Sequence, residues 1–407
     1  MKRIIFVNRY FFPDISSTSQ ILGDVAFHFA KTGRQVTVIT SRQRYDDPNA
    51  NLPPLETVEG IRIRRVASTR FGRSSIPSRA VDYLSFYPSV GAAIRSEARA
   101  GDILVAKTDP PLLSVVAQAA IKRGVQLVTW LQDLYPEVAM HLQVPFIRGN
   151  VARQLQRLRD GSLKVASANV VIGDRMAELI ESRGVSPQRI CQIPNWADDE
   201  DVTPVAHADN PLRREWGLEG HLVVGYSGNL GRAHEFETIL DAAHRLRDQT
   251  RILFLFIGGG ANFTQLEREV QSRGLAHLFR FQGYQPRSAL RFSLGVADIH
   301  WLSLRPELEG VIVPSKFYGI AAAGRPVISV TAADGETARL VTKYDCGAVV
   351  LPGDGPGLVE VLLRLADNPG EVTRLGDNAR KMLDAHFTRR HAFAKWERLV
   401  SDLERAE

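Results

Sequence analysis

The residues most suggestive of chemistry lie between positions 305 and 330. A carboxylate, a glycine, a proline, a hydroxyl and a lysine occur there within eight residues: Glu309, Gly310, Pro314, Ser315 and Lys316. Proline suits the first position of a helix, where its missing N–H costs nothing, so a short apolar helix is predicted to begin at Pro314. Helix starts and ammonium groups attract phosphate, and a carboxylate can hold sugar hydroxyls. The stretch suits a nucleotide-sugar diphosphate. The alternative is that this helix–Gly–x–Pro–strand pattern is an ordinary connection in an α/β fold and binds nothing.

Two glycine-rich turns are expected to follow strands in the second half of the chain. They span 228–232, which ends in Arg232, and 258–260. Glycine lets the backbone approach a phosphate or a base closely. Neither turn has the G-x-G-x-x-G spacing of a dinucleotide site, and no Walker loop is present.

Two carboxylates follow a predicted strand over 125–131. The sequence there reads Gln132-Asp133-Leu134-Tyr135-Pro136-Glu137. Carboxylates at the carboxyl end of such a strand are well placed for proton transfer in a ligand crevice. The alternative is that Asp133 only caps a turn.

The elements that must position these residues alternate between strand and helix. Strands are predicted over 4–8, 35–40, 61–66, 102–106, 125–131, 169–172, 222–227, 252–257, 279–282, 296–302, 327–330 and 346–351. Loops are expected over 45–57 and 70–79, an acidic linker over 197–210, and closing helices over 357–366, 372–385 and 389–403. The 407 residues therefore predict two doubly wound α/β domains that face one another with the ligand between them.

Charge and composition narrow the function classes. Residues 1–198 hold 26 basic and 17 acidic side chains, whereas the rest of the chain holds 25 and 28. The basic first half suggests an anionic partner such as a lipid surface, or simply a solvated basic face. Aromatic residues are not interleaved with the basic ones, which argues against nucleic acid. Cys191 and Cys346 have no disulfide or zinc spacing, and no apolar run approaches a membrane span.

Several motifs together resemble the retaining GT-B glycosyltransferases of the family 4 type, and most of all the O-antigen and exopolysaccharide transferases of the fucosamine-transferase kind. The similarity covers nearly the whole chain and is carried by five motifs: 10–14 (Tyr-Phe-Phe-Pro-Asp), 193–196 (Ile-Pro-Asn-Trp), 226–232 (Tyr-Ser-Gly-Asn-Leu-Gly-Arg), 309–316 and 323–328.

The resemblance implies an acceptor-binding domain over 1–198, a nucleotide-sugar domain over 199–385, and a C-terminal helix over 386–407 that packs back toward the first domain. It implies catalytic roles for Glu309, Arg232, Lys316 and Asp133. The donor would be bound by Gly228, Asn229, Gly231, Gly258, Gly260, Gly283, Tyr284, Gly310, Pro314 and Ser315, and the acceptor by Asp14, Ser17, Gln132 and Glu137. No metal or cofactor is implied, since basic residues would neutralise the diphosphate.

Three departures from the family pattern stand out. The second glutamate of its E-x7-E motif falls on Phe317, or on Gly319 when counted back from Gly324. Where the family has a His-Asp pair, this chain has Gln132-Asp133. Where the family has a lysine five residues after the loop arginine, this chain has Glu237, and Lys316 or His234 would compensate for the lost positive charge.

The expected function is transfer of a sugar from a UDP- or GDP-sugar to a lipid-linked saccharide in bacterial surface polysaccharide biosynthesis. The expected location is the cytoplasm, with peripheral contact to the inner face of the membrane. Two alternatives remain open at this point: a GT-B-fold UDP-sugar 2-epimerase and a non-catalytic partner subunit. The missing second glutamate suggests the non-catalytic subunit.

Overall fold

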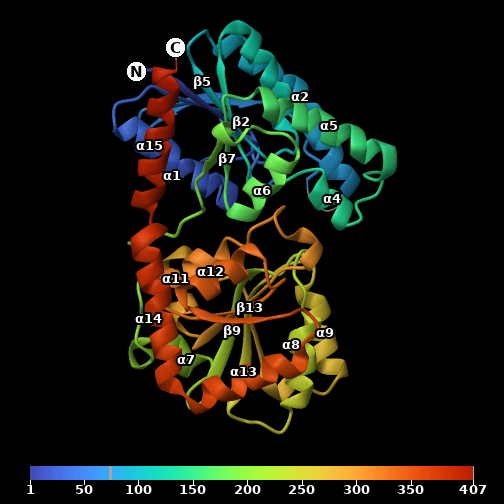
Figure 1. The fold of residues 1–407 in the computed structure, drawn as a ribbon, viewed down its shortest axis with the longest axis vertical. Coiled ribbons are helices and arrows are strands. Elements are labelled where there is room, and N and C mark those ends of the chain that lie inside the picture. The colour runs from blue at the N-terminus through green and yellow to red at the C-terminus, as the bar shows by residue number, and fades with distance from the viewer. Residues whose placement is uncertain (73–75, 407) are drawn as a thin grey trace. The chain divides into compact units, whose positions relative to one another are not determined.

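A computed structural model describes residues 1–72 and 76–406. The chain forms two compact units (Figure 1). Unit 1 comprises residues 1–194 together with 310–312 and 392–407, and unit 2 comprises 195–309 and 313–391. The expected linker, 197–210, is counted with unit 2, and the last helix contributes to unit 1 from Ala392 onward.

Unit 1 is built on an eight-stranded sheet in the order β3-β4-β2-β1-β5-β6-β7-β8. Its strands are β1 (Ile4–Val7), β2 (Val36–Ser41), β3 (Leu55–Val58), β4 (Ile61–Val66), β5 (Ile103–Lys107), β6 (Gln126–Trp130), β7 (Ala168–Val171) and β8 (Ile190–Gln192). All neighbours pair in parallel except β3, which runs antiparallel to β4. Buried aliphatic runs such as that of β1 fit a sheet covered on both faces.

The helices of unit 1 follow the strands as crossovers. They are α1 (Ser17–Lys31), α2 (Ile76–Glu97), α3 (Leu113–Ala117), α4 (Glu137–His141), α5 (Gly149–Val165), α6 (Asp174–Ser182) and α15 (Arg389–Arg405). Helix α15 packs on unit 1 through Trp396, whose ring centroid lies 4.6 Å from that of Trp130. Glu404 adds an ion pair to Arg34 at 2.8 Å.

Unit 2 has a six-stranded sheet, wholly parallel, in the order β11-β10-β9-β12-β13-β14. Its strands are β9 (Leu222–Asn229), β10 (Ile252–Gly259), β11 (Phe279–Gln282), β12 (Ile299–Ser303), β13 (Val327–Val330) and β14 (Gly347–Val350). Its helices are α7 (Pro211–Glu215), α8 (Glu237–Arg245), α9 (Phe263–Ser272), α10 (Leu290–Gly295), α11 (Lys316–Ala322), α12 (Glu336–Tyr344), α13 (Gly355–Asp367) and α14 (Pro369–His386). An aromatic and aliphatic cluster, including Phe256 and Trp301, fills one face of this sheet.

Each sheet has one point at which the strand order reverses. In unit 1 the chain moves outward from β1 through β2 on one side and through β5 and β6 on the other, and in unit 2 the same happens between β9 and β12. In doubly wound sheets, ligands bind outside the carboxyl ends of the strands at this point. The fold therefore predicts two candidate sites, one in each unit.

The predicted pair of doubly wound α/β domains is confirmed, and several local predictions are wrong. The loop expected over 45–57 ends in strand β3, because Leu55–Val58 finds an antiparallel partner in β4. Helix α2 occupies the last part of the loop expected over 70–79, of which residues 73–75 lie outside the described residues. Helix α12 was not anticipated, although its buried residues Thr337, Ala338 and Val341 have helical spacing.

Candidate active site

At the switch point of the unit 2 sheet lies the ammonium group of Lys316, the first residue of α11. Its Nζ lies 3.3 Å from the carbonyl oxygen of Asn229, where β9 ends, and 5.3 Å from the ring centroid of Tyr226. Lys316 thus bridges from the chain after β12 to the carboxyl end of β9, at the switch point of the sheet. Burial lowers the pKa of Lys316 to about 8, so the ammonium form still dominates at neutral pH.

The neighbour of Lys316 is a neutral histidine. His234 Nδ1 lies 2.7 Å from the carbonyl oxygen of Ser303, which can only accept, so Nδ1 carries the proton. Nε2 is therefore the acceptor that faces Lys316 Nζ at 3.4 Å. Burial and the Lys316 charge lower the pKa of His234 to about 3, which keeps the ring neutral. The ring orients the ammonium without competing with it for an anion.

The glycine of β9 provides the space that Lys316 occupies. Gly228 has a φ of 121°, and a Cβ at this position would lie 2.8 Å from Lys316 Cε. Any other residue would push the lysine stem away and strain the backbone. The expected turn is extended strand here, because Gly228 and Asn229 still pair with β10.

Replacing Gly228 with alanine is expected to displace Lys316 and to lower activity by about tenfold or more. The strained φ should also reduce the melting temperature by a few degrees. A Gly274→Ala variant is the matched control, because Gly274 also has a positive φ, 69°, and a Cβ there would meet nothing within 4 Å. Unchanged turnover of the Gly228 variant would show that the close approach to Lys316 is unimportant.

The glycines of the second predicted turn have a packing role. A Cβ at Gly258 would lie 2.2 Å from the carbonyl oxygen of Gly228, and one at Gly260 would lie 2.4 Å from Oδ1 of Asn229. Gly258 belongs to β10 rather than to a loop. These positions need glycine for the close approach of two strand ends, whatever binds beside them. Their contact with a nucleotide stays a prediction.

An aromatic ring and an arginine border this strand end. The Tyr284 ring lies over β10, because a Cβ at Gly259 would be 3.1 Å from Tyr284 Cε2. Tyr284 is 65% exposed, which leaves ring surface on which a base could stack. Arg232 is exposed, and the backbone of its loop is held by Asn262, whose Nδ2 donates to the carbonyl oxygen of Gly231 at 3.2 Å.

Glu309 lies against the start of α12. Its Oε2 accepts a hydrogen bond from the backbone N–H of Glu336 at 3.3 Å, and a Cβ at Gly335 would lie 2.4 Å from its Oε1. The amino end of a helix stabilises a carboxylate, so α12 fixes the position of this side chain. Sequence reasoning missed this support, whose signal is the Gly335-Glu336 pair before an amphipathic run.

The helix start expected at Pro314 is in the wrong place. Helix α11 begins at Lys316, Ser315 occupies the N-cap without a side-chain cap bond, and Pro314 precedes it. With seven residues the helix is short, so the lysine itself is the stronger anion-binding feature.

The positions where the family's second glutamate was sought cannot supply a carboxylate. Phe317 is 1% exposed and belongs to an apolar cluster with Leu302 and Val327. Gly319 has no side chain, and a Cβ there would meet only Leu294 at 3.6 Å. The packing of α11 therefore leaves no place for the family's second glutamate at either position.

Unit 1 places a buried lysine at its own switch point. Lys107, the last residue of β5, is 2% exposed; its Nζ donates to the carbonyl oxygen of Thr18 at 3.0 Å and lies 3.9 Å from the Trp130 ring centroid. Burial lowers the pKa of Lys107 to about 7, against the opposing charges of Asp109 and Asp133.

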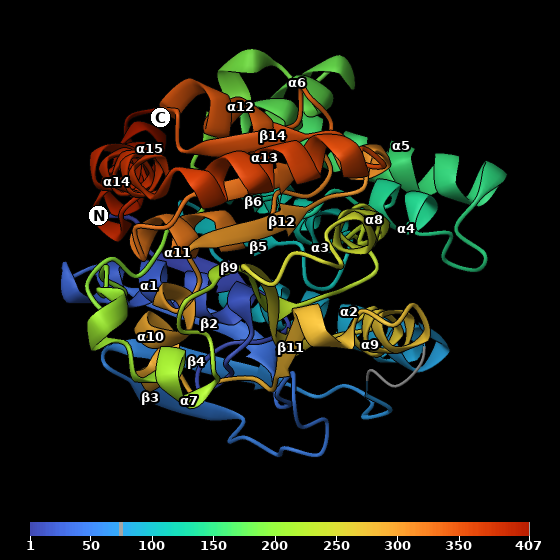
Figure 2. The ribbon, with the colours of Figure 1, turned by 90° about the horizontal axis from the view of Figure 1, so that it is seen from below.

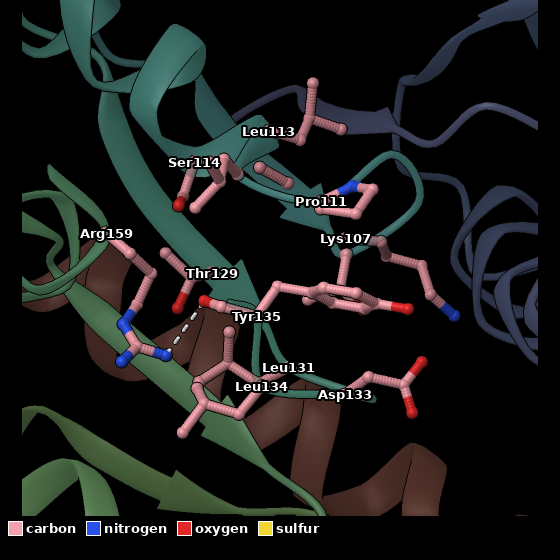
Figure 3. Close-up of a pocket in the computed structure, with 13 residues that line it drawn as sticks. Lys107, Pro111, Leu113, Ser114, Thr129, Leu131, Asp133, Leu134, Tyr135 and Arg159 are labelled. Atoms are coloured by element: carbon pink, nitrogen blue, oxygen red, sulfur yellow. Dashed lines mark hydrogen bonds between the residues drawn. The ribbon is translucent and has the colours of Figure 1, made fainter. Parts of the chain in front are cut away.

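Asp133 follows β6 beside this lysine. Burial and then the negative charge of Asp109 raise the pKa of Asp133, the Lys107 ammonium opposes them, and the resulting pKa is about 6. Figure 3 shows the Lys107 and Asp133 side chains extending to the same side of the sheet edge. A carboxyl group with this pKa can accept a proton near neutral pH. Sequence reasoning missed Lys107 and Asp109, although both flank the carboxyl end of a predicted strand.

A small cavity of about 10 Å³ lies behind these residues, close to the room that one water molecule needs. Leu113, Thr129 and Tyr135 are among the residues that line it (Figure 3). Arg159 closes one side by donating to the Tyr135 carbonyl oxygen at 3.2 Å. The cavity is too small for a sugar.

Two of the other predicted acceptor residues, Asp14 and Glu137, have side-chain partners. Asp14 accepts from the Ser16 backbone N–H at 2.8 Å. Glu137 is buried in an ion pair with Arg159 at 2.6 Å. Gln132 is 8% exposed, and its backbone N–H donates to the hydroxyl of Thr108 at 3.3 Å. Ser17 is exposed at the start of α1. Their acceptor role stays a prediction.

Gly310 belongs to unit 1. Its φ is 77°, and a Cβ there would lie 3.2 Å from the carbonyl oxygen of Arg175. The next residue, Val311, accepts a hydrogen bond from the Leu134 backbone N–H at 2.9 Å. The segment 310–312 therefore runs beside the loop that carries Asp133.

Two family models match the chain in succession. Residues 18–196 match the family described as "Glycosyl transferase 4-like domain", and residues 209–382 match "Glycosyl transferases group 1". Among the described residues, no group of three or more His, Cys, Asp or Glu side chains could hold a metal ion.

Curated relatives carry related names. The chain is 28% identical over 313 residues to the "Probable glycosyltransferase WbjE" of Pseudomonas aeruginosa, a match that covers 76% of this chain and 77% of that protein. It is 30% identical over 209 residues to the "Putative colanic acid biosynthesis glycosyl transferase WcaI" of Escherichia coli K12, covering 50% and 49%.

Solved structures share the fold. Sucrose-phosphate synthase from Thermosynechococcus elongatus superposes with a TM-score of 0.78 at 19% identity over the full length of both chains. Alr3699/HepE of Anabaena, solved with UDP-glucose, superposes with a TM-score of 0.73 at 14% identity over 99% of this chain and all of that one. At these identities the likeness concerns the fold.

Proposed function

Because the chain is a glycosyltransferase with the GT-B fold, made of a glycosyl transferase 4-like domain and a group 1 domain, we propose that it transfers a hexose or an aminosugar from a UDP- or GDP-sugar to a lipid-linked saccharide. The product would serve bacterial surface polysaccharide assembly, as the name of the colanic acid relative suggests. The UDP-glucose bound to the Anabaena protein supports a nucleotide-sugar donor.

The observation that carries the proposal is the position of Lys316 at the switch point of unit 2. A leaving nucleoside diphosphate develops negative charge, and a preorganised cation stabilises it most where water is scarce. Lys316 is held there by the Asn229 carbonyl and by a neutral His234. In this proposal Arg232 adds a second positive charge, which is why no metal ion is required.

Glu309 and Asp133 take the two remaining roles. Glu309, fixed at the start of α12, accepts hydrogen bonds from the hydroxyls of the donor sugar. Asp133 accepts the proton of the attacking acceptor hydroxyl, for which its raised pKa is suited. We propose retention of the anomeric configuration, with leaving group and acceptor reacting on the same face of the sugar and no protein nucleophile.

Because the proposed acceptor is attached to lipid, we also propose a cytoplasmic location and an anionic membrane surface as a partner. The excess of basic residues in 1–198 supports such a contact. Among the described residues, no helix is long and apolar enough to cross a membrane.

The test is a calorimetric screen of UDP- and GDP-sugars, followed by product analysis. We expect one nucleotide sugar to bind, and EDTA to leave both binding and transfer unchanged. Transfer should require an added lipid-linked acceptor. Conversion of the nucleotide sugar into an epimer without acceptor would identify an isomerase instead, and failure to bind any nucleotide sugar would identify a non-catalytic subunit.

A further inference from the structure

Helix α5 and the loop before it expose apolar and basic side chains on one surface of unit 1. The helix runs along the margin of the unit beside α4, in both views (Figures 1 and 2). We propose that this surface, residues 146–165, docks on a bilayer containing anionic lipid. The inference deepens the proposed function by assigning its membrane contact to a particular element.

The apolar part of the surface is a stripe along the helix. Val151, Leu158 and Val165 recur every seven residues, which keeps them on nearly the same side of an α-helix. They are 52%, 52% and 50% exposed. Phe146, just before the helix, is 83% exposed, more than any other large apolar side chain among the described residues apart from Met1.

The loop holds Phe146 outward at a cost. The φ of Phe146 is 69°, and the φ of Gln143 is 53°. Positive φ is unusual for a bulky residue and is unfavourable. Phe146 is not buried within this chain, so burial does not offset the cost of its positive φ. Contact with an apolar phase would bury the ring and offset that cost.

A basic stripe runs parallel to the apolar one. Arg153, Arg157 and Lys164 lie on the other side of the exposed face, and Arg148 is exposed at the helix start. Small or neutral residues, among them Gln154 and Gly161, separate the two stripes. The only acidic residue in the sequence of α5 is Asp160, which pairs with the buried Arg159 at 2.7 Å. The strongly exposed charged side chains of α5 are therefore all basic.

This combination fits an interfacial helix. An apolar stripe can enter the boundary between head groups and acyl chains, while neighbouring basic side chains contact anionic head groups. An acidic protein or a nucleic acid would use the basic stripe alone and would leave Phe146 and Leu158 in water. The apolar contribution therefore distinguishes the membrane from those partners.

Vesicle co-sedimentation of the full chain tests the proposal, with phosphatidylcholine vesicles that contain or lack phosphatidylglycerol and with no nucleotide sugar present. We expect Arg153→Gln with Arg157→Gln to weaken binding roughly thirtyfold, and Phe146→Ser with Leu158→Ser to weaken it roughly tenfold or more. Binding of the unaltered protein should weaken with salt.

Two double variants are the matched controls. Arg214→Gln with Arg398→Gln removes the same charge from strongly exposed positions in α7 and α15. Val81→Ser with Leu84→Ser removes exposed apolar groups from α2. Both should bind as the unaltered protein does. Thermal unfolding should confirm that all four double variants remain folded.

Several outcomes would contradict the proposal. Salt-insensitive binding, no binding, or binding weakened equally by the controls would remove α5 as the docking surface. Dependence on charge without dependence on Phe146 and Leu158 would show that the apolar stripe does not enter the bilayer, against the proposal. Transfer to a short water-soluble acceptor should be unchanged in the α5 variants. A chain that transferred no sugar but bound vesicles through α5 would contradict the proposed activity alone.

Discussion

Replacing Lys316 with alanine is expected to lower turnover roughly tenfold to a thousandfold, the range for losing one group that stabilises developing charge. The ammonium lies at the switch point of the unit 2 sheet, 3.3 Å from the Asn229 carbonyl. Loss of Arg232 should act in the same direction, because it carries the second positive charge beside the strand end. Steady-state kinetics with the identified nucleotide sugar would measure both.

Two further variants separate the charge of Lys316 from its packing. Lys316→Met keeps the aliphatic stem against Gly228 and should lose as much turnover as the alanine variant. Lys381→Ala removes a lysine from the exposed surface of α14 and should have no effect. Near-normal transfer by Lys316→Met would show that the diphosphate does not bind beside Lys316.

The affinity for the donor should also depend on pH in a defined direction. Burial lowers the pKa of Lys316 to about 8, so its charge is fully present below that pH and is lost above it. Donor binding by the unaltered protein should therefore weaken on the alkaline side, while binding by Lys316→Met should not follow this profile.

The architecture could be predicted from sequence because its signals are local. Alternating apolar strands and amphipathic helices, as in 222–257, define the parallel sheets without knowledge of their packing. Strand β3 was missed because Leu55–Val58 is half exposed and becomes a strand only through its partner β4. The start of helix α11 was predicted two residues too early, at Pro314 instead of Lys316.

The site was harder to predict because its contacts join distant parts of the chain. The glycine pattern drew attention to Gly258 and Gly260, but not to their close packing against Gly228 and Asn229. Glu137 stands next to Asp133 in the sequence motif, yet it forms a buried ion pair with Arg159. Residue type predicts which chemistry is available, and tertiary packing decides which groups remain available for it.

In unit 1 that packing creates a small group of interacting charges. The Asp133 carboxyl has Asp109 and Lys107 as its charged neighbours, and they act on it in opposite directions. The lysine is fixed by the Thr18 carbonyl and the Trp130 ring. The pKa of the Asp133 carboxyl group can therefore be adjusted by neighbours that do not touch the substrate.

Asp133→Asn is expected to lower turnover roughly a hundredfold to ten-thousandfold, because the variant cannot accept the acceptor's proton. In the unaltered enzyme, kcat/KM should rise with pH through about 6, where Asp133 loses its proton. Lys107→Met removes the cation that favours the ionised carboxylate, so this limb should move to higher pH. Asp109→Asn removes a repelling charge and should move it to lower pH. Shifts in the same direction, or an unchanged limb in both variants, would show that Asp133 is not the titrating base.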